Sequence, residues 1–94
     1  MARQDIREAI GRIEQMEQCF DALREAVANC PNALRNDPAL SAMLESLTQY
    51  YDGGLWLKDY ELDEQGLLPP TLKRGVLSQD GVYDLLEQIN RMDV

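Results

Sequence analysis

Four acidic side chains close together in the sequence are the first candidates for chemistry. They are Asp59, Glu61, Asp63 and Glu64. Hard divalent cations prefer oxygen ligands, and the alternation at 59, 61 and 63 resembles the first half of a calcium loop. That loop needs glycine at its sixth position and glutamate at its twelfth, where this chain has Glu64 and Pro70. A divalent-metal or small-ligand site on this cluster, near Tyr60 and Lys73, is one hypothesis.

A structural role for the same acidic cluster is the simpler interpretation. On a helix, Asp59 and Asp63 are four residues apart and repel each other unless a cation lies nearby. Lys73 and Arg74 are the only adjacent basic residues, and they could fold back to supply that charge. We favour this internal role over an exposed one in which they bind a carboxylate or phosphate of a partner. Gly75 is expected to supply a turn with positive φ.

Aromatic residues gather in the second half of the chain. They comprise the single tryptophan and all four tyrosines: Tyr50, Tyr51, Trp56, Tyr60 and Tyr83. Aromatic and arginine side chains dominate binding hot spots, so a partner-binding surface of Trp56, Tyr60, Lys73 and Arg74 is a second hypothesis. In a small helical domain the same rings can instead form the core between the last two helices, with tyrosine hydroxyls bonded to carboxylates such as Asp59. For these aromatic rings we favour the role in the core over a role in partner recognition.

Several classes of active site lack their residues here. The chain has no histidine, which removes the commonest general base and most zinc and haem sites. No phosphate-binding glycine loop is present. Cys19 and Cys30 lack CxxC spacing, and we expect both to be free, buried thiols in a reducing cytoplasm. The sequence therefore predicts a protein that is not an enzyme and carries no cofactor.

The charge and hydropathy of the chain restrict its partners. The formal charge is −8, and the nine basic residues are scattered without forming a stripe. Binding to nucleic acid or to an anionic membrane is therefore not expected. No apolar run reaches the roughly 20 residues that cross a bilayer, and the N-terminus shows no secretory signal. A protein partner is expected; mimicry of a nucleic acid would need carboxylates arrayed on one face.

Helical periodicity dominates the elements that must position these residues. We expect helices over about 4–30, 38–62 and 79–91, with a break near Gly53-Gly54 and a proline-rich turn before the last helix. Asp37 and Pro38 are a good N-cap and N1 pair. The length of 94 residues suits one domain, 1–94. The predicted fold is all-α: a three-helix bundle built on a long helical hairpin.

The first predicted helix carries an unusually long apolar stripe. Two seven-residue series offset by three make up this stripe: Ile6, Ile13, Phe20 and Val27, and Ala9, Met16, Leu23 and Cys30. Packing within the chain is the default. Because this helix is longer than the others, part of its stripe could stay uncovered, and a homodimer through the first helix is an option.

Two segments resemble a family of small, acidic, uncharacterised bacterial proteins. RIEQMEQCFDAL matches an RIxxMExxFDxL pattern, and YYDGGLWLKDYELDEQGLLPPTLKRGVLSQDGVYDLL matches YYxxGxWxxDYExDExGLLPxxLKRGVLSxDxxYxLL. Gly53 replaces a serine of that pattern, and Pro70 makes a double proline. The resemblance implies a compact helical protein of the bacterial cytosol and brings no activity or ligand. The leading hypothesis is a non-enzymatic protein-interaction or scaffold module; the alternative is the ligand or metal site at 59–64.

Overall fold

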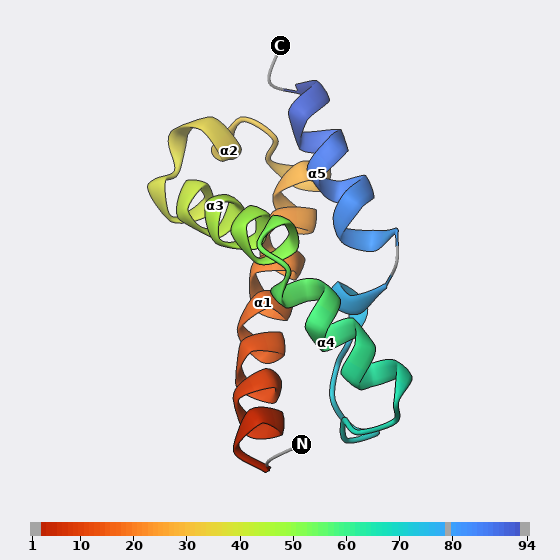
Figure 1. Ribbon diagram of the computed structural model, residues 1–94. Coiled ribbons are helices and arrows are strands. Elements are labelled where there is room, and N and C mark those ends of the chain that lie inside the picture. The colour runs from red at the N-terminus through yellow and green to blue at the C-terminus, as the bar shows by residue number, and fades with distance from the viewer. Residues whose placement is uncertain (1–2, 79, 93–94) are drawn as a thin grey trace.

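The computed structural model describes residues 3–78 and 80–92, and over these ranges the chain is helical without a β-strand. The all-α prediction is therefore confirmed. The elements are α1 (Arg3–Asn29), α2 (Ala33–Asn36), α3 (Pro38–Asp52), α4 (Leu55–Glu64), the 3-10 helix η1 (Gly75–Leu77) and α5 (Gly81–Met92). The described part thus contains five α-helices where the sequence predicted three (Figure 1).

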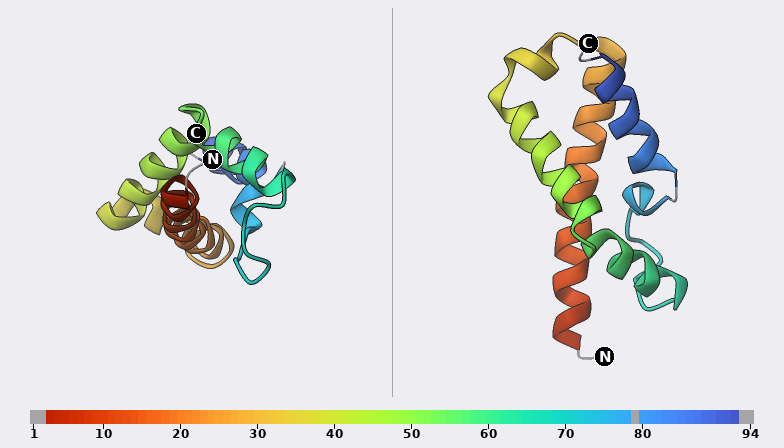
Figure 2. Two further views of the ribbon diagram at one scale, coloured as in Figure 1. Left: turned by 60° about the horizontal axis from the view of Figure 1, so that its bottom comes forward. Right: turned by 45° about the horizontal axis from the view of Figure 1, so that its top comes forward.

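Helix α1 runs along the long axis of an elongated molecule measuring 43 × 23 × 21 Å. Helix α3 crosses α1 obliquely, and α5 lies beside the C-terminal half of α1 (Figure 1). In the right-hand view of Figure 2, α3 lies on one side of α1 and α4 and α5 on the other. The chain returns from α4 to η1 through residues 65–74, which contain no helix.

The predicted second helix is divided at the two glycines. Gly53 ends α3, its N–H donating to the Gln49 carbonyl oxygen at 2.8 Å. Gly54 follows with φ +92°, a left-handed conformation that favours glycine because it has no Cβ. Helix α4 therefore starts in a new direction. At the other end of α3, Asp37 caps the helix by accepting a hydrogen bond from the Ala39 N–H at 2.9 Å, and Pro38 takes the first helical position.

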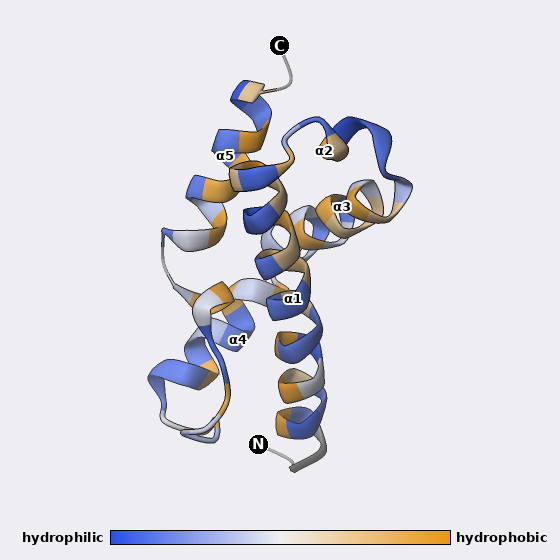
Figure 3. Cartoon of the chain, turned by 180° about the vertical axis from the view of Figure 1, so that it is seen from behind, coloured by the Kyte–Doolittle hydropathy of each residue, from blue (hydrophilic) through white to orange (hydrophobic). Residues whose placement is uncertain are grey.

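The apolar core collects one face of each long helix around α1. Figure 3 shows hydrophobic and hydrophilic residues alternating along α1, as in an amphipathic helix. Most of the predicted stripe is buried within this one chain, while Ile6 and Val27 are half-buried and Cys30 is exposed. The largest fully buried apolar side chains are Ile13, Leu23, Leu47, Leu62, Val76 and Val82.

The two cysteines differ in their surroundings. Both are free, and Cys19 is buried in the core. Cys30 is exposed, so the prediction that both thiols are buried is wrong for this residue. The reason is that Cys30 lies just beyond the last residue of α1, where the chain turns toward α2. Among the described residues, no helix combines the length and apolar character needed to cross a membrane.

Candidate interaction surface

Asp59 of α4 lies at the junction of three helices. Its carboxylate is fully buried and accepts from Arg12 of α1, with Nε to Oδ2 at 2.9 Å and Nη2 to Oδ1 at 2.5 Å. The Tyr50 hydroxyl of α3 donates to the same Oδ2 at 2.7 Å. The expected bond between a tyrosine and Asp59 is thus present. Because every bond to this carboxylate comes from inside the chain, Asp59 joins α1, α3 and α4.

The electrostatics of this junction match its geometry. The hydrogen bond to Asp59 raises the pKa of the Arg12 guanidinium, against an opposing effect of burial. Burial, followed by the hydrogen bond to Asp59, raises the pKa of the Tyr50 hydroxyl far above its ordinary value of 10.0. Both groups therefore stay protonated at neutral pH and act as permanent donors to Asp59.

The rest of the acidic cluster does not converge with Asp59. Asp63 pairs with Arg74, which also donates to the backbone oxygens of Pro69 and Leu72. Glu61 and Glu64 are exposed. Within residues 3–78 and 80–92, no group of three or more His, Cys, Asp or Glu side chains could hold a metal ion. This arrangement does not favour the metal or small-ligand alternative.

The two adjacent basic residues have different roles. Arg74 is held by Asp63 and two carbonyl oxygens, in agreement with the internal role that the sequence favours. Lys73 projects outward with 79% of its side chain exposed, and its Nζ lies 3.7 Å from Asp21 Oδ2 on α1. Lys73 therefore forms its ion pair with a carboxylate of α1 and not with the 59–64 cluster.

Val76 in η1 is held through its backbone from two sides. Its N–H donates to Glu17 Oε2 of α1 at 2.8 Å, and its carbonyl accepts from Trp56 Nε1 of α4 at 2.8 Å. Glu17 is buried, so this bond satisfies a charged group inside the protein. These two bonds hold η1, which follows the 65–74 link, against both α1 and α4.

Gly75 does not supply the turn with positive φ that the sequence predicts. Among the described residues, positive φ is found only at Gly54 and Gly66, so the predicted left-handed turn at Gly75 is wrong. A Cβ on Gly75 would instead lie 2.8 Å from Glu17 Oε1. Glycine at this position leaves room for the Glu17 carboxylate, which approaches the backbone closely.

The aromatic surface consists of Tyr51, Trp56, Tyr60 and Tyr83. The Trp56 ring stacks on Tyr60 and meets Tyr51 edge-on, with centroids 5.2 Å apart in each pair. These three rings are half-buried, whereas Tyr50 is in the core. Tyr83 is 52% exposed, so the prediction of a core role is wrong for this ring. On α5, Tyr83 lies about 100° around the helix from Val82, off the buried face.

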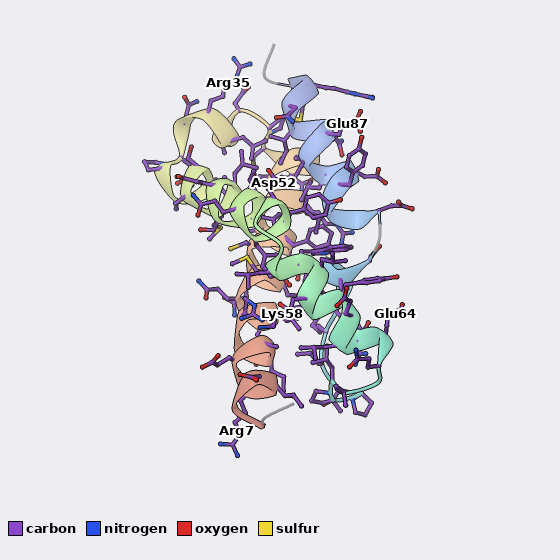
Figure 4. All side chains as sticks on the ribbon, in the orientation of Figure 1. Arg7, Arg35, Asp52, Lys58, Glu64 and Glu87 are labelled. Carbon is purple, nitrogen blue, oxygen red and sulfur yellow. The ribbon has the colours of Figure 1, made fainter. Side chains whose placement is uncertain are left out.

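A groove of about 460 Å³ between α3 and α5 continues the aromatic surface, and we call it the α3–α5 groove. Its lining comprises Leu44, Thr48, Tyr51, Asp52, Tyr83, Leu86, Glu87 and Asn90. Figure 4 labels Asp52 on α3 and Glu87 on α5, the two helices that form its walls. The charge of Glu87, and then a hydrogen bond with it, raises the pKa of Tyr83. The groove thus combines tyrosine rings with carboxylates.

The structure brings together two of the four predicted partner-binding residues, Trp56 and Tyr60, and places Lys73 and Arg74 in other surroundings. Trp56 and Arg74 carry internal hydrogen bonds, Tyr60 stacks on Trp56, and Lys73 is exposed near Asp21. The sequence analysis did not single out Leu57, which is 52% exposed on α4, and it named Tyr83 only as one of the aromatic residues expected in the core. Asp59 and Leu62 are the buried residues of α4 and therefore mark the face of the helix that packs against the core. At 3.6 residues per turn, Leu57 lies on the opposite face of α4. Arg12 and Glu17 were also missed, although they are charged residues at the two edges of the apolar stripe.

Comparison with known proteins gives a family without an assigned activity. A family model described as "Domain of unknown function (DUF4298)" matches residues 13–92. The chain belongs to this family, which agrees with the resemblance to an uncharacterised family. No curated protein and no solved structure matches the chain.

Proposed function

We propose that this chain is a non-enzymatic protein-interaction module of the bacterial cytoplasm that binds its partner through the aromatic surface. The observation that carries the proposal is the continuity of this surface. Ring contacts link Tyr51, Trp56 and Tyr60, and Tyr51 shares the α3–α5 groove with Tyr83. Aromatic side chains bury much area at a low cost in conformational entropy, which is why they are enriched at interfaces.

The exposed residues beside these rings support the same proposal. Leu57 precedes Tyr60 by three residues on α4, so the two side chains are neighbours on the helix surface. Leu57 and Tyr83 are each 52% exposed. Two large, exposed apolar side chains next to half-buried rings provide area that a partner could cover.

The state of the charged groups supports the non-enzymatic part of the proposal. Asp59 is bonded to Arg12 and Tyr50, Asp63 to Arg74, and Glu17 to the Val76 N–H. A general acid or base must reach its substrate. These carboxylates are instead committed to bonds between elements of the chain.

The proposed compartment and source rest on other observations. Free Cys19 and Cys30 suit a reducing compartment such as the cytoplasm. The bacterial source rests on the sequence resemblance. The homodimer through α1 is not part of this proposal, because Ile13, Met16 and Leu23 of the stripe are buried within one chain.

Affinity capture with matched surface variants tests the proposal. Tagged wild-type protein and the variants Leu57→Ser, Tyr83→Ser and Leu67→Ser are used to capture proteins from bacterial cytoplasmic extract, with quantitative mass spectrometry as the readout. Leu67 is the control because it is 40% exposed, lies in the 65–74 link and is not part of the aromatic surface. We expect a protein that wild type and Leu67→Ser retain and that Leu57→Ser and Tyr83→Ser lose. Capture of nothing above background, or equal capture by all variants, contradicts the proposal.

A further inference from the structure

The composition of the α3–α5 groove restricts what could bind there. Two of its lining residues, Asp52 and Glu87, are acidic, and no described lysine or arginine lines it. Asp84 lies one residue beyond Tyr83 on α5, and the chain as a whole carries a charge of −8. The groove therefore offers a negative potential to a ligand.

Arg91 of α5 carries a positive charge close to one carboxylate of the groove. Arg91 Nη2 is 2.8 Å from Glu87 Oε1, one turn along α5. The side chains of this pair are 77% and 40% exposed, and an ion pair at such a position is weak because water and salt screen it. Glu87 can therefore exchange Arg91 for a better-placed cation at little cost.

We propose that the α3–α5 groove binds an arginine-bearing segment of a basic protein partner. This inference rests on the proposed function and adds the chemistry of the partner. A guanidinium can form paired hydrogen bonds with Asp52 or Glu87 while its plane stacks on the Tyr51 or Tyr83 ring. Leu44 and Leu86 supply apolar lining for the aliphatic stem of the arginine or for a neighbouring apolar side chain.

Arginine fits this lining better than lysine does. Its planar, weakly hydrated guanidinium matches a carboxylate and a ring face together, whereas an ammonium group is compact and strongly hydrated. Tyr83 presents its ring without disturbing the core, because half of its side chain is already exposed.

Peptide titrations followed by NMR test this inference. The probes are a helical peptide with two arginines and two leucines on one face, and two counterparts with lysine or glutamine in place of the arginines. Isotope-labelled protein reports the site through its backbone amide shifts. We expect the arginine peptide to shift amides of residues 44–52 and 83–90, to bind several-fold more tightly than the lysine peptide, and the glutamine peptide not to bind.

Charge-neutralising variants complete the test. Asp52→Asn and Glu87→Gln should each lower the affinity for the arginine peptide about two- to fivefold, the range expected for the loss of one partly exposed charge pair. Glu14→Gln, an exposed change on α1, should leave binding unchanged. No binding, shifts elsewhere, equal affinity for the lysine peptide, or wild-type affinity in both groove variants overturns the inference.

The two proposals can fail separately. A cellular partner that is lost with Leu57→Ser but binds Asp52→Asn and Glu87→Gln with the same affinity as wild type keeps the interaction module and overturns the arginine-binding groove. Failure to capture any protein overturns the interaction module whatever the peptides do.

Discussion

Arg12 of α1 and Asp59 of α4 form a doubly hydrogen-bonded ion pair between residues 47 positions apart in the sequence. The Asp59 side chain is fully buried, whereas that of Arg12 is 22% exposed. The pair joins two helices, and Tyr50 adds α3 to the same carboxylate. This junction holds α4, and with it the Trp56 and Tyr60 rings, in a fixed position against α1.

Breaking this ion pair from one side should strongly destabilise the protein. Asp59→Asn leaves the Arg12 guanidinium in a partly buried site without its counter-charge, and we expect a loss of about 2–4 kcal/mol in the free energy of unfolding. Urea denaturation measures this change. The double variant Arg12→Met/Asp59→Leu removes both charges and should recover much of the loss. A double variant that is no more stable than Asp59→Asn would contradict this description of the junction.

Tyr50 should make the stability of the protein fall at alkaline pH. The pKa of Tyr50 is raised in the folded state above its ordinary value of 10.0. Above pH 10 the unfolded state releases this proton and the folded state retains it, so the free energy of unfolding decreases as pH rises. Tyr50→Phe should cost about 1 kcal/mol at neutral pH through the lost hydrogen bond. Urea midpoints between pH 8 and about 11.5 should fall less steeply for Tyr50→Phe than for wild type; equal slopes would argue against a buried, raised Tyr50.

Two glycine-to-alanine changes should have opposite effects. In Gly75→Ala the new Cβ would lie 2.8 Å from Glu17 Oε1, so Glu17 must shift and its bond to Val76 weakens. We expect a loss of about 1–2 kcal/mol. Gly11→Ala meets no atom within 4 Å in the middle of α1 and should stabilise the helix by about 0.5–1 kcal/mol. Thermal unfolding distinguishes the two, and a neutral Gly75→Ala would mean that the close approach of Glu17 is unimportant.

The adjacent basic residues should differ in their effect on stability. Arg74→Lys cannot reproduce the bonds that Arg74 makes to Asp63, Pro69 and Leu72, because an ammonium group lacks the fork of donors. We expect a loss of about 1–2 kcal/mol. Lys73→Ala should change stability by less than about 0.5 kcal/mol, since its side chain is 79% exposed. Chemical denaturation of both variants checks this order, and a reversed order would refute the internal role of Arg74.

The sequence predicted local features well because their causes are local. The apolar periodicity of α1, the Asp37-Pro38 start of α3 and the break at Gly53-Gly54 depend on residues that are close along the chain. The choice of partner for Asp59 could not be predicted in this way. Lys73 and Arg74 were nearer in the sequence than Arg12, and only the crossing of α1, α3 and α4 decides which cation reaches the carboxylate.

The candidate site was predicted less completely for the same reason. The sequence indicates that Trp56 belongs to a group of aromatic residues. Its hydrogen bond to Val76 could not be predicted, because it depends on the path of the 65–74 link. Tyr83 was grouped with the core by residue type, although its position on α5 lies off the Val82 face. Gly75 illustrates a third limit: a glycine can leave room for the close approach of a side chain from another helix, which no local turn pattern reveals.

The interaction role of the aromatic surface is tested most directly by the affinity of the captured partner. Isothermal titration calorimetry of the purified pair gives Kd for wild type, Tyr83→Ser and Leu67→Ser. We expect Tyr83→Ser to raise Kd at least about tenfold, as for the loss of an interface hot spot, and Leu67→Ser to leave it unchanged. Equal Kd values for wild type and Tyr83→Ser would contradict the proposal that this surface binds the partner.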